Sequence, residues 1–364
     1  MKYIIGILLL VHGLIHFMGV AKAFSIAEIS QLSQSISKNM GMLFLFAGLF
    51  FIASFLLFIF KSELGIVVAI LGGVLSQVLI VIYWQDAKFG TLANIIILVA
   101  ALMALSTRNF KKTYMMDVSK VIEVSGVSKT VITEDDIKNL PEPVQKYLRY
   151  TDVLGKPGIF NMKLSFKGEM RSKKNDWFSF TSQQINTFNE PARLFFMDAK
   201  VKGLPTSGYH FYRNDTASMR IKLLSLIPVA SNNTPELFPT ETVTYFNDLC
   251  LFAPAALIDE RIEWEIIDAT SVRAYFKNQG VTISAVLHFN DIGQLVNFVS
   301  DDRYDIDDMK KYRFSTPASH YKNYHGYNLP SYGEAIWHYP DGEFVYGRFW
   351  VQNIEYNIPI KKGK

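Results

Sequence analysis

Four apolar stretches in the first 106 residues restrict the fold of this chain more than any other feature of its sequence. Roughly 20 apolar residues cross about 30 Å of hydrocarbon as an α-helix, and lipid satisfies no backbone polar group, so spanning segments must be helical. Short polar joins at 61–63 and 85–88 make consecutive helices antiparallel. The sequence therefore predicts a four-helix transmembrane domain over residues 1–106, with spans at 3–20, 40–60, 65–84 and 91–105.

The first stretch also has the outline of a secretory signal peptide, with Lys2 before it and a small-residue motif at 21–23 after it. His12 and His16 interrupt its apolar core, and three further stretches follow. These features favour a retained transmembrane helix over a cleaved leader.

Charge at the ends of the spans predicts an orientation. Four spans place both ends of the bundle on one side of the membrane, and Lys and Arg concentrate on the cytoplasmic side. The side shared by the two ends carries Lys2, Lys61, Arg108, Lys111 and Lys112. The opposite side carries Lys22, Lys38 and Lys88. We therefore expect a multi-pass cell-membrane protein whose soluble domain is cytoplasmic.

Two histidines, His12 and His16, stand one helical turn apart inside the first span, so both rings share one helix face. Polar groups within membrane segments usually face the bundle interior and often mark function. Gln77 and Asn94 in later spans are candidate companions. Three interpretations stay open: interhelical hydrogen bonds, a metal or haem site, or a quinone or lipid contact. No carboxylate lies within these spans, and we expect neither a bound metal nor another cofactor.

After residue 106 the sequence becomes polar, and residues 107–139 are expected to form a linker. Thr133 followed by three acids is typical of a helix start. Residues 140–148 read as a short amphipathic helix that opens at Pro143 and buries Val144, Tyr147 and Leu148.

Beyond Gly158 the apolar residues alternate with period two, which indicates β-strands with one buried face. An aromatic-rich hairpin turns at Asp341-Gly342, whereas residues 240–257 have helical spacing that breaks at Pro254. We expect residues 140–364 to form an α+β domain, a curved antiparallel sheet of roughly ten strands, half-barrel-like, with covering helices. The other expected strands cover 160–171, 177–185, 192–201, 208–214, 218–229, 262–267, 271–277, 280–289 and 294–302.

The composition excludes several classes of function. The net charge of +4 is too small to indicate a nucleic-acid partner. The single cysteine, Cys250, allows no internal disulfide, and we expect it to be buried. The sequence contains no Gly-x-Ser-x-Gly elbow, phosphate loop or Gly-rich dinucleotide turn, so we identify no catalytic residue and favour a non-enzymatic role.

Several motifs are similar to those of an uncharacterised bacterial family of membrane proteins with a domain of unknown function. In the first half they are "HGLIHFMGVAKAF" (12–24) and "LSQVLIVIYWQDAKFGTLAN" (75–94). In the second half they are "LPEPVQKYLRY" (140–150), "MRIKLLSLIPV" (219–229), "FAPAALI" (252–258) and "YHGYNLPSYGEAIW" (324–337). This resemblance implies a four-span bundle followed by a β domain, and it assigns no catalytic residue.

The closing segment, 327–357, is distantly similar to the last hairpin of periplasmic lipoprotein carriers of the LolA/LolB type. That resemblance implies a curved antiparallel sheet closed by helices, with an apolar cavity for acyl chains. This chain departs from those carriers in its four-span anchor and in having no lipoprotein signal, so the resemblance implies a fold rather than lipoprotein transport.

Three functions follow from these observations. The first is a membrane-anchored module that binds a lipid or another hydrophobic ligand on the concave face of its sheet; its ligand-binding residues cannot be named from the sequence. The second is a membrane redox or metal protein that uses the intramembrane histidines. The third is a structural or regulatory scaffold whose sheet is filled by its own side chains. Besides the bilayer, the expected partner is a hydrophobic small molecule or lipid.

Overall fold

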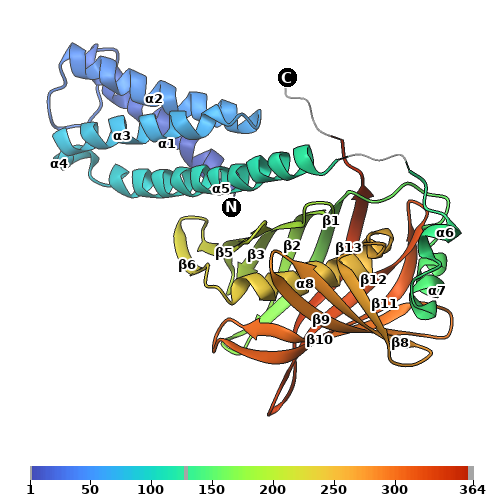
Figure 1. The fold of residues 1–364 in the computed structure, drawn as a ribbon. Coiled ribbons are helices and arrows are strands. Elements are labelled where there is room, and N and C mark those ends of the chain that lie inside the picture. The colour runs from blue at the N-terminus through green and yellow to red at the C-terminus, as the bar shows by residue number, and fades with distance from the viewer. Residues whose placement is uncertain (1, 127–129, 360–364) are drawn as a thin grey trace. The chain divides into compact units, whose positions relative to one another are not determined.

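The structure is a computed structural model of the full chain, and it describes residues 2–126 and 130–359. The chain divides into two compact units, Met1–Phe110 and Lys111–Lys364, and each is described by itself. We call the first the helical unit and the second the β unit (Figure 1).

The helical unit confirms the four apolar helices. Four of its helices are long and apolar enough to cross a membrane. Its elements are α1 (Lys2–Ala23), α2 (Lys38–Ile59), α3 (Leu64–Ile82), α4 (Trp84–Ala87) and the first part of α5 (Gly90–Val124).

The end of α5 differs from the expectation. We expected the fourth span to end at residue 105 and a linker to begin at 107, but the helix continues to Val124. Residues 91–125 contain neither glycine nor proline, the two residues that most disfavour a helix interior. The change from apolar to polar residues therefore ends the apolar stretch without ending the helix.

The helical unit buries several polar side chains beside its apolar core and exposes many large apolar side chains. His12, His16, Ser76 and Asn94 are buried. Large apolar side chains point outward instead; on α3, more than half of the surface is exposed for Leu71, Val74, Val78 and Val81. Polar groups turned inward and apolar groups turned outward are expected of helices surrounded by lipid.

Glycine allows α1 and α2 to approach each other closely. A Cβ atom added to Gly13 would lie 3.2 Å from the carbonyl oxygen of Gly48, and one added to Gly48 would lie 3.0 Å from that of Gly13. Small residues of this kind are typical where membrane helices pack.

The β unit contains one 13-stranded antiparallel sheet in the order β6-β5-β4-β3-β2-β1-β13-β12-β11-β10-β9-β8-β7. The first strand pairs with the last, so the two halves of the chain's β region meet at the centre of the sheet. The strands are β1 (Asn161–Ser172), β2 (Asn175–Thr187), β3 (Ala192–Val201), β4 (Leu204–Arg213), β5 (Thr216–Leu223), β6 (Ile227–Asn232), β7 (Ile262–Ile266), β8 (Ser271–Asn278), β9 (Val281–Phe289), β10 (Leu295–Asp305), β11 (Lys310–Tyr324), β12 (Tyr327–Tyr339) and β13 (Gly342–Tyr356).

The sheet curves around α8 (Leu237–Phe252), which links the two edge strands and lies within the concave face (Figure 1). The ring of Tyr245 on α8 lies 5.6 Å from that of Tyr212 on β4 and 5.8 Å from that of Phe276 on β8. One helix therefore packs against both halves of the sheet, and nearly all of its residues are buried. The predicted half-barrel with a covering helix is confirmed, and so is the break at Pro254, where the 3₁₀ helix η1 (Pro254–Leu257) begins.

Two further helices follow the predicted pattern. Thr133 and Asp136 form a capping box at α6 (Glu134–Ile137). α7 (Glu142–Tyr150) buries Val144, Tyr147 and Leu148, as its apolar spacing indicated.

The number of strands was underestimated. The stretch expected as one strand, 218–229, forms two, because Leu224 and Ser225 have φ values of 54° and 55° and turn the chain between β5 and β6. Strand β11 was not predicted either. Left-handed backbone is uncommon at residues other than glycine, and the apolar stretch 218–229 contains no glycine that would mark a turn. This turn therefore could not be predicted from the sequence.

The last turns of α5 pack on the convex face of the sheet. The ring of Tyr114 lies 5.4 Å from that of Phe196 on β3 and 5.5 Å from that of Tyr209 on β4. The hydroxyl of Tyr209 donates to Asp117 Oδ2 at 3.0 Å. Residues 111–124, expected to form part of a linker, therefore belong to the packed β unit.

Candidate ligand-binding site

The concave side of the sheet encloses two adjoining chambers beside α8. The outer chamber has a volume of about 350 Å³ and lies between the start of α8 and the ends of strands from both halves of the sheet. Much of its wall is apolar; these residues include Met170, Phe178, Met197, Met219, Ile221 and Phe344. Strand periodicity explains the lining, because alternate residues on each strand point inward.

The inner chamber is smaller, about 80 Å³, and lies deeper between α8 and the central strands. Phe166, Leu251, Phe252 and Phe314 are among its apolar lining residues. Six residues line both chambers, namely Arg193, Phe195, Thr244, Arg303, Tyr346 and Phe349. Between Glu241 and Cys250 every residue of α8 except Thr244 is buried, so Thr244 is the helix residue that faces the junction of the chambers.

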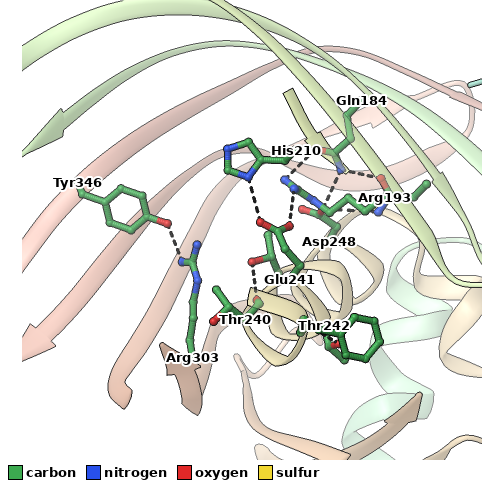
Figure 2. Close-up of polar contacts among 12 residues, drawn as sticks. Gln184, Arg193, His210, Thr240, Glu241, Thr242, Asp248, Arg303 and Tyr346 are labelled. Carbon is green, nitrogen blue, oxygen red and sulfur yellow. Dashed lines mark hydrogen bonds and ion pairs between the residues drawn. The ribbon is translucent and has the colours of Figure 1, made fainter. Parts of the chain in front are cut away.

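A charge cluster, which we define as Gln184, Arg193, His210, Glu241 and Asp248, forms one wall (Figure 2), and all of its members except the partly exposed His210 are buried. Arg193 lies between two carboxylates: Nε donates to Asp248 Oδ2 at 2.6 Å, and Nη1 to Glu241 Oε2 at 3.2 Å. Gln184 Nε2 donates to Asp248 at 2.7 Å, and His210 Nδ1 donates to Glu241 Oε1 at 3.0 Å. Each buried charge thus has a partner, as the low dielectric of an interior requires.

The pKa values of the two carboxylates in this cluster are shifted in opposite directions. Burial alone would raise the pKa of Glu241, but the hydrogen bond from His210 and the positive charges around the carboxylate lower it to about 2. Burial raises the pKa of Asp248, and the contacts from Arg193 offset only part of that effect. The cluster therefore keeps Glu241 ionised over a wide pH range.

Arg303 has different surroundings. It forms no ion pair among residues 2–126 and 130–359, and its one hydrogen bond runs from Nη1 to the Tyr346 hydroxyl at 2.6 Å (Figure 2). Its guanidinium carbon lies 4.2 Å from the ring centre of Phe314 and 4.9 Å from that of Trp337. The Nε atom is buried without a hydrogen-bond partner. A cation–π contact stabilises the positive charge without using any N–H donor, so the donors in the plane of the guanidinium remain available for hydrogen bonds.

In the helical unit the structure brings together three of the four predicted polar residues. His12 Nε2 lies 3.0 Å from Asn94 Oδ1, and Asn94 Nδ2 donates to Gln77 Oε1 at 3.0 Å. Ser76 was not among the predicted residues; its Oγ lies 3.3 Å from His12 Nε2 and 3.0 Å from Asn94 Nδ2.

The fourth residue, His16, lies outside this hydrogen-bond network. Its Nδ1 donates to the backbone carbonyl of His12 at 3.0 Å, and its Nε2 is buried without a partner. The two histidine rings are 5.0 Å apart. Within the described part of the chain, no group of three or more His, Cys, Asp or Glu residues is placed to hold a metal ion.

Sequence reasoning did not identify the charged residues of the β unit. A signal for Arg193 was present, because it shares the inward parity of Phe195 and Met197 on β3. Glu241 and Asp248 lie on a helix whose apolar residues cover more than one face. The sequence therefore does not show that these two acids are buried rather than exposed. Cys250 is buried, as expected.

Residues 130–349 match the profile of DUF6544, a family of unknown function. The fold is similar to that of a LolA superfamily protein from Nitrosomonas europaea, with 9% identity, a TM-score of 0.36, and coverage of 60% of this chain and 96% of that one. It is also similar to a beta-barrel-like protein of the domain of unknown function DUF1849 from Brucella abortus, with 8% identity, a TM-score of 0.20, and coverage of 55% and 99%. No curated protein matches the sequence significantly. Because the family profile covers more than half of its length, the chain belongs to the DUF6544 family.

Proposed function

We propose that the β unit binds a hydrophobic ligand, such as the acyl chain of a lipid, in the two chambers beside α8. The observation that carries this proposal is the outer chamber of about 350 Å³, whose walls are largely apolar and also carry charged side chains from several strands and from α8. Ligand sites are typically concave, mostly apolar and supplied with a few fixed polar groups. A scaffold whose sheet is filled by its own side chains would leave no space of this size.

We further propose that the four apolar helices span the membrane and hold the β unit beside it. The inward-facing polar residues and outward-facing apolar residues of the helical unit support this role. We assign His12, Gln77 and Asn94 to interhelical hydrogen bonding, because each has a partner on another helix. A metal or haem role for His12 and His16 would need further ligands.

The distribution of basic residues leads us to place the β unit in the cytoplasm. Reporter fusions at the carboxyl terminus test this placement in bacterial cells. Green fluorescent protein should be fluorescent there and alkaline phosphatase inactive. Active phosphatase with a dark fluorescent protein would place the β unit on the opposite side.

Ligand binding is tested with the full chain in phosphatidylcholine nanodiscs and a palmitate analogue that carries a photoreactive diazirine. After irradiation, mass spectrometry should find label on peptides of the chamber walls, such as those of β5 and β13. Thr244→Trp places an indole at the junction of the chambers and should lower that labelling roughly tenfold, equivalent to about 1.4 kcal/mol of binding free energy.

The matched control is Ser218→Trp, a tryptophan on the opposite face of β5 from Met219. It should leave the labelling unchanged. Label confined to the apolar helices, or equal chamber labelling in the wild type and Thr244→Trp, would contradict ligand binding in the chambers.

A further inference from the structure

We propose that the ligand is an anionic amphiphile, and that Arg303 binds its carboxylate or phosphate group. This inference rests on the proposed hydrophobic-ligand function and specifies the chemistry of the ligand. The juxtaposition that carries it is a guanidinium that forms no ion pair with a described carboxylate, at the point where the two chambers meet.

The two arginines that line both chambers provide an internal comparison. Arg193 is neutralised within the protein, because it forms ion pairs with both Glu241 and Asp248. The two oxygens of Glu241 are already used, one by Arg193 and the other by His210. Among the described residues no carboxylate pairs with Arg303. The charge of Arg303 acts on Glu241 only at longer range, so a cation without a direct carboxylate contact faces the cavity and is electrostatically suited to an anionic group.

The residues around Arg303 fix the orientation of its guanidinium but use only one of its nitrogen atoms as a hydrogen-bond donor. Phe314 and Trp337 flank the guanidinium, and the Tyr346 hydroxyl accepts a hydrogen bond from Nη1 alone. Nε is buried and has no acceptor. A carboxylate or phosphate accepts two parallel hydrogen bonds from a guanidinium, so an anion in this position would also satisfy donors that the fold leaves unused.

The position of Arg303 also divides the ligand into a head and a tail. Arg303 lines both chambers, whereas the larger outer chamber is lined by Met197, Met219, Ile221 and other apolar residues. An anionic head bound at the junction would leave a single acyl chain to extend along this apolar wall. The expected ligand class is therefore a fatty acid or an acidic lipid with a chain accessible to the chamber, which share the same head-group chemistry.

The test compares the diazirine palmitate analogue with its uncharged methyl ester, using the full chain in phosphatidylcholine nanodiscs at mildly alkaline pH. We expect the acid to label the chamber peptides at roughly tenfold lower concentration than the ester, because charge-assisted hydrogen bonds are strong in a desolvated site. Arg303→Gln should remove this preference, and Arg303→Lys should restore part of it. Labelling by the ester should persist in both variants, which shows that the chambers remain folded.

Arg313→Gln is the matched control, because Arg313 lies on the neighbouring strand and pairs with Asp301 at the surface. It should keep the full preference for the acid. Equal labelling by acid and ester in the wild type, or an unchanged preference in Arg303→Gln, would overturn the anionic-head proposal while leaving hydrophobic binding intact. Absence of chamber labelling by either probe would instead overturn the proposed function itself.

Competition then separates the two sources of the anion. Unlabelled palmitate added to the solution, or phosphatidylglycerol built into the nanodisc, should displace the labelled acid. Displacement by palmitate alone indicates a free fatty acid, and displacement by phosphatidylglycerol indicates a bilayer lipid. Failure of both competitors would overturn the proposal.

Discussion

At the scale of single residues, Glu241 connects the stability of the β unit to its polar site. Its carboxylate is buried, accepts hydrogen bonds from Arg193 and His210, and has its pKa lowered to about 2 from an ordinary 4.5. A depressed pKa in the folded state means that the ionised carboxylate stabilises the fold. This contribution is fully present above about pH 4.5 and is lost as the pH falls toward about 2.

Replacing Glu241 by glutamine should therefore have a pH-dependent effect. Near neutral pH we expect Glu241→Gln to lower the free energy of unfolding by about 3 kcal/mol, the equivalent of the pKa shift. The difference from the wild type should shrink as the pH falls from about 4.5 to about 3. Denaturant unfolding of the full chain, followed by tryptophan fluorescence, measures it. Glu260→Gln, which changes an exposed carboxylate, is the control, and an equal loss at both ends of the pH range would contradict the prediction.

Residue pattern predicted some positions and not others. Val144, Tyr147 and Leu148 could be placed in the core, because helical spacing alone puts them on one face. The partners of Arg193 could not be predicted, because Asp248 is 55 positions away in sequence and is brought near only by the curvature of the sheet. Long-range polar pairing of this kind leaves no periodic signal.

At the scale of elements, the sequence predicted whether a segment is a helix or a strand better than it predicted where that element ends. Strand alternation identified most of the sheet, since period two is a local property. The continuation of α5 beyond residue 105 was not predicted, because the composition of a helix can change from apolar to polar without any change in its backbone. The same helix then provides an amphipathic end, with Tyr114, Val118 and Val121 buried.

This end of α5 should contribute measurably to the stability of the β unit. Tyr114 is only 2% exposed and packs between Phe196 and Tyr209. Tyr114→Ala removes a buried ring and should cost about 3 kcal/mol of unfolding free energy. The neighbouring Met115 is 48% exposed, so Met115→Ala should cost little. Chemical denaturation of both variants measures the difference, and equal costs would show that the helix end is not packed on the sheet.

At the scale of the whole molecule, two units with different burial patterns share one continuous helix. The helical unit buries histidine and asparagine beside a small apolar core and exposes many large apolar side chains, whereas the β unit buries a large aromatic-rich core around α8. This division, together with the chambers beside α8, is the basis for our proposal of a ligand-binding domain held at a membrane. The length and apolarity of the four spans made the helical unit predictable. The open space inside the sheet could not be predicted, because it depends on how side-chain volumes fit together in three dimensions.

The most direct test is an experimental structure of the full chain, extracted with its native lipids and held in a lipid nanodisc. We expect elongated density along the apolar wall of the outer chamber, ending near Arg303. A chamber closed by its own side chains, or one that contains only ordered water, would contradict the proposal that this fold binds a hydrophobic ligand.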